Sequence, residues 1–274
     1  MGELTVRVNA GEHLEREIDV PANSDFRLFL EKGASARLVA KFFGESGKTT
    51  QRIELAPGSQ LALCEIKKSE AGGEFSSEIT IAKGAKFLGL NSVVSGGRVG
   101  EKREIFLAGK GASADYSEIF WENGEERLES NLLIVHSERD TSATAHSRGL
   151  VSGGGSARAR GLVRIEKRAQ KANSFLSQHA MLLDSESRND SLPFLEIEAN
   201  DVKARHSAAA GPIDPEQVFY LQSRGLSREE AIRTIALGFL LGKLPGFESI
   251  PGDDSALSSI ERLFGEKWRR SIEK

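Results

Sequence analysis

The stretch LEKGASARL, from Leu30 to Leu38, is the first copy of a repeat, because related stretches recur along the first 120 residues. They are LAPGSQLAL at 55–63, IAKGAKFLG at 81–89 and GKGASADYS at 109–117. The steps between the central glycines are 25, 26 and 27 residues, at Gly33, Gly58, Gly84 and Gly111. Steps this regular indicate a structural repeat with a period of about 25 residues.

Each copy joins a glycine turn to a segment in which apolar and polar residues alternate. Glycine takes positive φ at little cost, and segments such as SARLVAKF and SQLALCEI are typical of strands with one buried and one wet face. Strands that recur at this period without intervening helices favour a β-solenoid, so we expect a mainly β chain. An antiparallel meander or sandwich is the alternative, since short strands with regular turns also describe those folds.

Helix signals replace the alternation after Gly211. Asp214 is a predicted N-cap followed by Pro215, and Ser227 and Glu230 form a predicted capping box. We therefore predict a β-helix core domain at 1–210 and a C-terminal helical domain at 211–274.

Within the helical region, Gly225 is the predicted end of the first helix, and a last helix is predicted from about Ser255. The chain is predicted to break before that last helix, at Pro245, Gly246, Pro251 and Gly252.

Composition excludes several classes of protein. The 274 residues carry a formal net charge of -3, so no global basic field points to a nucleic-acid partner. No apolar run approaches the roughly 20 residues that span a bilayer, and the N-terminus lacks a secretory signal, so we expect a cytoplasmic protein without a membrane partner. Cys64 is the only cysteine, which excludes an internal disulfide and a thiolate cage built from one chain.

Catalytic motifs are absent from the sequence. The segment 44–49, GESGKT, resembles the end of a nucleotide-binding loop, but Phe42 stands where that loop needs glycine and a strand pattern follows. The segment 152–156, SGGGS, is either a backbone cradle for an anion or a solenoid turn. No carboxylate pair stands out as a general acid and base, so polysaccharide cleavage, a frequent use of β-solenoids, has no positive support. A β-solenoid carbohydrate-active enzyme or binding module remains the alternative.

The histidines form no local metal site, because no two are spaced i, i+2 or i, i+4. For each one alone, a surface histidine or a satisfied core histidine is the default interpretation. They are His13, His136, His146, His179 and His206.

The segment 193–239, PFLEIEANDVKARHSAAAGPIDPEQVFYLQSRGLSREEAIRTIALGF, resembles the C-terminal signature of the SufB/SufD proteins of the SUF iron–sulfur cluster assembly system. The segment 147–187 resembles the preceding turns of their β-helix. The resemblance is strong over 147–239 and weaker, but compatible, before that.

The resemblance implies a right-handed parallel β-helix flanked by helices, in agreement with the repeat. It further implies dimerisation through the β-helix, with a SufB-type paralogue or a second copy, and a C-terminal helical domain that docks the ABC-type ATPase SufC. The chain would then be a non-catalytic scaffold component. It would have no intrinsic cofactor, and an iron–sulfur cluster would be shared transiently across the dimer interface.

His206 aligns with the histidine that the family presents at the subunit interface, and a neutral imidazole suits iron. The resemblance therefore makes His206 the candidate metal and cluster ligand. Family members can carry Cys or Glu where this chain has Ile197, Ala204 and Ser207. From these departures we expect a SufD-like chain, and from its start in β pattern we expect a short form of the family.

The family uses the FYLQSRG and GF regions in or near the ATPase contact. By this resemblance, the candidate partner-binding residues are Phe219, Tyr220, Arg224 and Phe239. In the alternative interpretation, Phe219 and Phe239 are core residues and Arg224 caps a helix end. The sequence leaves open homodimer or heterodimer, cluster type and sulfur donor.

Overall fold

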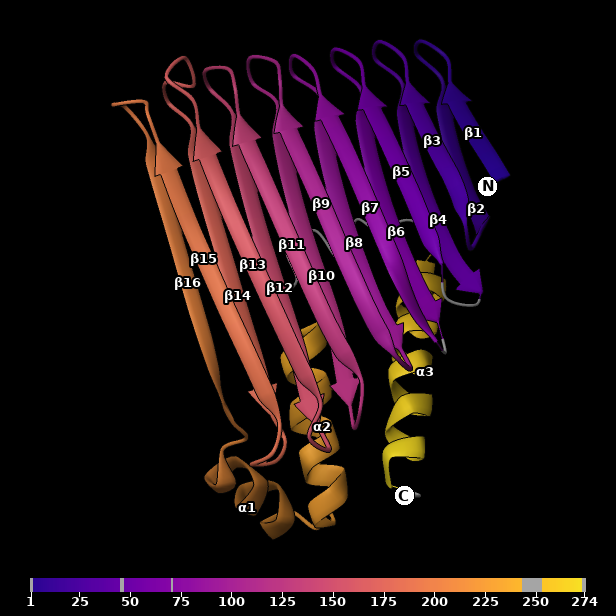
Figure 1. The fold of residues 1–274 in the computed structure, drawn as a ribbon, viewed down its shortest axis with the longest axis vertical. Helices are drawn as coiled ribbons and strands as arrows, with labels where there is room; N and C mark the ends of the chain where they lie inside the picture. Colours follow the sequence, from indigo (N-terminus) through magenta and orange to yellow (C-terminus); the bar gives the residue numbers. More distant parts are fainter. Residues whose placement is uncertain (1, 45–46, 70, 243–252, 273–274) are drawn as a thin grey trace.

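The computed structural model describes residues 2–44, 47–69, 71–242 and 253–272, in which sixteen strands form two parallel sheets and three helices follow (Figure 1). Sheet A contains the odd-numbered strands, in the order β1 (Gly2–Val8), β3 (Ser24–Leu30), β5 (Lys48–Leu55), β7 (Gly72–Ile81), β9 (Arg98–Leu107), β11 (Arg127–His136), β13 (Ser156–Ile165) and β15 (Arg188–Ile197). Sheet B contains the even-numbered strands, from β2 (His13–Pro21) through β4 (Ser35–Gly44), β6 (Gln60–Ser69), β8 (Lys86–Ser95), β10 (Ser113–Asn123), β12 (Ser142–Ser152) and β14 (Asn173–Leu182) to β16 (Lys203–Pro212).

Neighbouring strands pair in parallel in both sheets, and the chain alternates between the sheets. Each turn therefore adds one strand to each sheet, which confirms the predicted parallel β-solenoid. The antiparallel meander and the sandwich are wrong, because their neighbouring strands would run in opposite directions.

The glycine turns stack as regularly as the strands. Gly33, Gly58 and Gly84 have positive φ of 68°, 71° and 63°. The amide of Gly33 donates to the carbonyl of Pro57 at 3.1 Å, and the amide of Gly58 to that of Lys83 at 2.9 Å. The repeat found in the sequence is thus one hydrogen-bonded edge of the solenoid.

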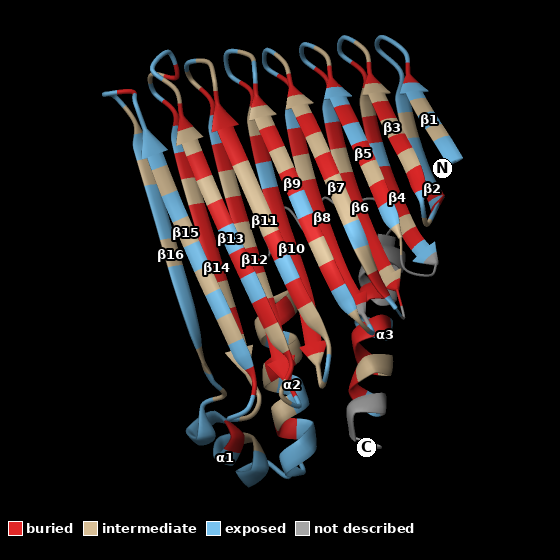
Figure 2. Ribbon diagram, viewed as in Figure 1, coloured by how far each residue is buried: buried red, intermediate tan, exposed pale blue. Residues whose placement is uncertain are grey.

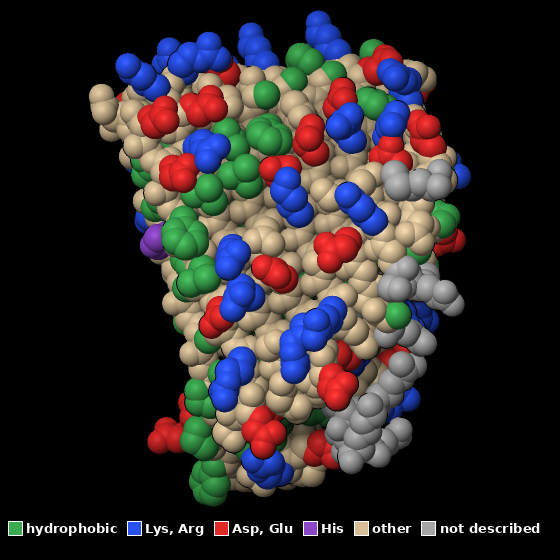
Figure 3. Space-filling view, in the orientation of Figure 1, with side chains coloured by type: hydrophobic (Ala, Val, Ile, Leu, Met, Phe, Trp, Pro, Cys, Tyr) green, Lys and Arg blue, Asp and Glu red, His purple; other side chains and the backbone are tan. Residues whose placement is uncertain are grey.

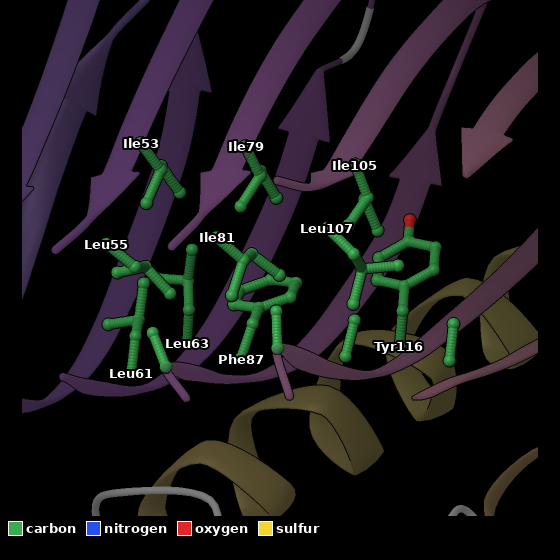
Figure 4. Close-up of a cluster of buried hydrophobic side chains, with 14 of the residues drawn as sticks. Ile53, Leu55, Leu61, Leu63, Ile79, Ile81, Phe87, Ile105, Leu107 and Tyr116 are labelled. Atoms are coloured by element: carbon green, nitrogen blue, oxygen red, sulfur yellow. The ribbon is translucent and has the colours of Figure 1, made fainter. Parts of the chain in front are cut away.

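The main apolar core lies between the sheets (Figures 2 and 4). Residues in register on β5, β7 and β9 form two of its rows, Ile53, Ile79 and Ile105 in one and Leu55, Ile81 and Leu107 in the other. Leu63, Phe87 and Tyr116 from sheet B belong to the same core. Full burial of each aliphatic side chain in these rows contributes about 1.5–3 kcal/mol.

A charged layer also lies inside the solenoid. The Nζ atom of Lys67 on β6 lies 2.8 Å from both carboxylate oxygens of Glu101 on β9. Nη2 of Arg103 lies 2.6 Å from Oε2 of Glu65, and its guanidinium stands 4.9 Å from the ring centre of Tyr116. All four charged side chains are buried. Burial of an unpaired charge is strongly unfavourable, so each of these charges needs its ion-pair partner to be stable in the core.

The helices are α1 (Pro215–Ser223), α2 (Arg228–Leu241) and α3 (Asp253–Ile272). The side chain of Asp214 accepts from the amide of Glu216, and Ser227 and Glu230 form a reciprocal capping box, so both predicted starts are confirmed. The last helix begins at Asp253, close to the predicted position. The predicted break at Pro245, Gly246, Pro251 and Gly252 lies outside the described residues. None of the described helices combines the length and apolarity needed to cross a bilayer.

The two outer faces of the solenoid differ. Helices α2 and α3 pack on sheet B, where Trp121 of β10 meets Trp268 of α3 with 5.4 Å between ring centres and lies stacked on Phe264 at 6.4 Å (Figure 1). The outer face of sheet A carries Lys and Arg interspersed with Asp and Glu (Figure 3). The domain division at residue 210 stays a prediction; β16 continues to Pro212.

Candidate functional site

The last turn of the solenoid is open. β15 and β16 are the terminal strands of sheets A and B, and in the described part of the chain no further strand pairs with either. An unpaired strand edge presents backbone N–H and C=O groups to another chain. This end of the solenoid is therefore a candidate protein-binding edge.

The side chains that face the inside of the solenoid are buried in the earlier turns but exposed at this edge. Leu176 on β14 is 1% exposed, whereas His206, its partner in register on β16, is exposed. Ile165 on β13 is fully buried, whereas Ile197, its partner on β15, is 44% exposed. Positions that are buried in the core in an earlier turn are thus exposed to solvent at the open end.

The structure brings no companion metal ligands to His206. Within the described ranges, no group of three or more His, Cys, Asp or Glu side chains is arranged to hold a metal ion. Ala204 packs against the core, and Ser207 lies on the opposite face of β16, with Oγ 3.3 Å from Nε2 of His179. His206 therefore offers one imidazole donor, and a metal bound there would need ligands from a partner.

Cys64 cannot supply a thiolate at this edge. It lies on the outer face of β6 in the cluster that α2 and α3 cover, and it is fully buried. Burial, with a smaller contribution from the charge of Glu65, raises the pKa of the Cys64 thiol to about 12. The Cys64 thiol therefore stays protonated at neutral pH.

Helix α1 presents a second exposed surface (Figure 2). Phe219 is 72% exposed and Tyr220 is 57% exposed, so the interpretation of Phe219 as a core residue is wrong. Arg224 is the C-cap residue of α1, and its guanidinium stands 5.3 Å from the ring centre of Tyr220. An exposed aromatic pair with an adjacent arginine has the composition of a protein-binding hot spot.

Phe239 occupies a different environment on α2. It is half-buried against the cluster beneath the helices, so it lies apart from the exposed pair on α1. Nη1 of Arg148 on β12 donates to the carbonyl of Phe239 at 2.8 Å and also to the carbonyl of Gly242. A cation on the last carbonyls of a helix satisfies them and complements the helix dipole. Arg148 thus attaches the end of α2 to the solenoid.

Sequence reasoning missed Arg148 and the histidines around it. Strand alternation places His146, Arg148 and Leu150 on one face, but nothing in the sequence indicates that a helix end covers them. Burial, followed by the charge of Arg148, lowers the pKa of both His146 and His179. The three side chains form a polar layer on the outer face of sheet B.

Taken together, these features define a class of protein: a parallel β-solenoid with an open last turn and a helical unit attached to one face. The family model described as "SUF system FeS cluster assembly, SufBD core domain" matches residues 17–239. The chain belongs to this SufBD family.

Curated relatives agree with the family model. The chain is 31% identical over 134 residues to an "Iron-sulfur cluster assembly SufBD family protein" of Staphylococcus epidermidis, covering 49% of this chain and 29% of that protein. It is 29% identical over 136 residues to a protein of the same description in Mycobacterium tuberculosis, covering 50% of this chain and 16% of that protein. The alignment thus spans less than a third of either relative.

Proposed function

We propose that this chain is a non-catalytic, SufD-like component of the SUF iron–sulfur cluster assembly scaffold. In this role it dimerises through the last solenoid turn and binds a SufC-type ABC ATPase through α1 and α2. The observation that carries the proposal is the family match over residues 17–239, which includes both the open turn and these helices. The carbohydrate-active alternative gains no support from the family or from the relatives.

The open turn supports dimerisation. β15 and β16 offer two unpaired strand edges, and Leu192, Phe194 and Ile197 on β15 are large apolar side chains left exposed. Strand addition at such an edge would satisfy backbone groups and cover apolar surface in one step. The partner is a SufB-type paralogue or a second copy of this chain.

The helices support ATPase docking. Phe219, Tyr220 and Arg224 form an exposed aromatic and cationic surface on α1, next to the end of β16. α1 packs on α2, and Arg148 attaches the end of α2 to β12. Movement of an ATPase bound to α1 would therefore reach the solenoid through packed elements. Phe239 belongs to this internal connection more than to the docking surface.

The cluster is the cargo of this proposal. His206 would contribute one ligand at the dimer edge. Every thiolate would come from a SufB-type paralogue, because Cys64, the only cysteine of this chain, is buried beneath the helices in either copy of a homodimer. The chain would then act mainly as scaffold and lever.

Co-expression with the cognate ABC ATPase, followed by affinity purification, tests the docking surface. We expect the ATPase to copurify and the Phe219→Ala/Tyr220→Ala double variant to retain less than about a tenth of it, since buried aromatic anchors contribute 2 kcal/mol or more each. Phe43→Ala is the matched control, because Phe43 is also an exposed aromatic but lies on β4. Equal recovery of the ATPase by the double variant and the control would refute docking through α1.

The edge is tested separately by the oligomeric state. We expect Ile197→Lys to weaken dimerisation, with or without the SufB-type paralogue, while leaving ATPase binding intact. His206→Ala should lower the cluster yield of the anaerobically reconstituted full complex without changing its assembly. Unchanged cluster yield would remove His206 as a ligand and leave the scaffold role standing.

A further inference from the structure

A groove of about 510 Å³ crosses the outer face of sheet A, where β9, β11, β13 and β15 begin (Figure 3). Arg98, Arg127 and Arg188 are the first residues of β9, β11 and β15. Strand register aligns them in one row across the sheet, with Ser156 of β13 between the second and the third. The row places three guanidinium groups along one side of the groove.

This row breaks the charge pattern of its own sheet face. Every other arginine on the outer face of sheet A pairs with a carboxylate. These pairs are Arg7–Glu31, Arg27–Asp25, Arg52–Glu78, Arg158–Asp190, Arg160–Glu129 and Arg164–Glu196.

By contrast, Arg98, Arg127 and Arg188 form no ion pair with a carboxylate in the ranges that the structure describes. Arg98 and Arg127 are direct neighbours in register, an arrangement of like charges that destabilises a sheet. Nη1 of Arg127 donates to the carbonyls of Gly124 and Glu126, at 3.0 and 2.6 Å, which holds this guanidinium in place.

The acidic residues of the groove do not neutralise the row. Asp190 pairs with Arg158 at 3.2 Å, and Glu129 pairs with Arg160 at 3.9 Å. The third, Glu74, lies over Gly100, with Oε2 only 2.3 Å from where a Cβ at that glycine would be. Three guanidinium groups therefore face a single carboxylate without an ion pair, which leaves a surplus of positive charge.

The nearby glycine turn does not compete as an anion site. Asp184 already fills it: the carboxylate accepts from the amides of Gly153, Glu186 and Ser187, at 2.5, 3.0 and 2.8 Å. The anion cradle considered for segment 152–156 is thus occupied by the chain itself. The arginine row has no such internal occupant.

We propose that this groove binds a small molecule that carries two or more linked phosphate groups. Neighbouring strands lie about 4.8 Å apart, so Arg98 and Arg127 can bracket one phosphate, and Arg188, about 10 Å from Arg127, meets a later one. Guanidinium forks bind phosphate oxygens in pairs, and the volume is that of a typical small-molecule site. The ligand is either a free condensed phosphate or the phosphate chain of a nucleotide.

Calorimetric titration with inorganic triphosphate and, separately, with ADP tests this site at constant physiological ionic strength. We expect saturable binding with one ligand per chain. Equal or tighter binding of triphosphate identifies the phosphate chain as the whole ligand, whereas tighter binding of ADP shows that a nucleoside occupies the rest of the groove. Absence of saturable binding of both probes would overturn the proposal.

The Arg98→Gln/Arg188→Gln double variant should weaken triphosphate binding by about a hundredfold or more, since each lost charge-assisted contact should lower the affinity about tenfold or more. Both arginines are exposed and unpaired, so the fold should persist with an unchanged midpoint of thermal unfolding. Arg7→Gln/Arg52→Gln removes the same charge from the same face, away from the groove. An equal loss of affinity in this control would show a diffuse charge effect and overturn the site.

Discussion

The middle turns and the last turn of the solenoid share register and parallel pairing. They differ in the burial of the side chains that face the inside of the solenoid. In the turns from β5 to β9 the inner rows are buried and include both apolar side chains and ion-paired charges. In β15 and β16 the same rows contain half-buried or exposed side chains such as Leu195, Ile197 and His206. The middle turns therefore provide the stability of the solenoid, and the last turn provides a surface for recognition.

The largest loss of stability is expected when a paired charge in the middle turns loses its partner. Burial alone would lower the pKa of Arg103, but the attraction of Glu65, with smaller contributions from Tyr116 and Glu101, raises it. Arg103→Met leaves Glu65 charged and buried, at an expected cost of about 3–5 kcal/mol in the free energy of unfolding. Urea unfolding monitored by circular dichroism measures this cost.

A second variant checks the cause of that loss. Glu65→Leu/Arg103→Met removes both charges and should recover most of the lost stability. If the double variant is as unstable as Arg103→Met, packing around Tyr116 and not the stranded charge is responsible.

Truncation of an apolar side chain in a core row should lower the free energy of unfolding slightly less. Ile79 is fully buried between Ile53 and Ile105, so Ile79→Ala removes packed side-chain volume from the row. We expect a loss of about 2–5 kcal/mol in the free energy of unfolding. Leu195→Ala is the comparison in the last turn, and an equal loss there would contradict the assignment of stability to the middle turns.

The pH dependence tests a buried histidine at the end of β11. Burial lowers the pKa of His136 from 6.5 to about 4. As the pH falls from 6.5 to about 4, the imidazole of His136 is protonated in the unfolded chain but stays neutral in the folded chain. The free energy of unfolding therefore decreases over this range. The full effect is about 3 kcal/mol.

Urea midpoints measured across this pH range for the wild-type chain and for His136→Gln isolate the effect. Burial raises the pKa of Glu122 to about 8, which gives a slope of opposite sign, but that slope is common to both proteins. A pH dependence that is the same in both proteins would exclude His136 as its source.

The smallest change in stability is expected at the open end. Ile197 is already 44% exposed, so Ile197→Lys should alter the free energy of unfolding of the monomer by less than about 0.5 kcal/mol. Its effect should appear in self-association, which analytical ultracentrifugation measures. A large loss of monomer stability would mean that the last turn is as tightly packed as the middle.

Much of the fold could be predicted from local chemistry. The glycines at 33, 58, 84 and 111 mark the repeat because each turn needs a positive φ, and Asp214 and Ser227 mark helix starts because their side chains cap the nearest amides. The alternation in SQLALCEI, by contrast, predicts one wet face for β6, whereas both faces are covered: Leu63 lies in the inner core, and Cys64 and Ile66 lie beneath the helices.

The candidate sites were less accessible to sequence reasoning. Glu65 and Arg103 are 38 positions apart on different sheets, so their pairing depends on the closure of a turn. Arg148 reaches the end of α2 across 91 residues. The exposure of Phe219 depends on how α1 sits on α2, and the row of Arg98, Arg127 and Arg188 appears only when the strands are in register. Contacts of long sequence separation were therefore the ones missed.

The contact between Trp121 and Trp268 also has a consequence for the order in which the chain is synthesised. The first turns of the solenoid can stack as they leave the ribosome, because each one needs only its predecessor. The outer face of sheet B, including Cys64, Ile66 and Trp121, stays uncovered until α3 has emerged. We expect ribosome-bound chains that end before residue 253 to expose this apolar strip, which the complete chain covers with α3.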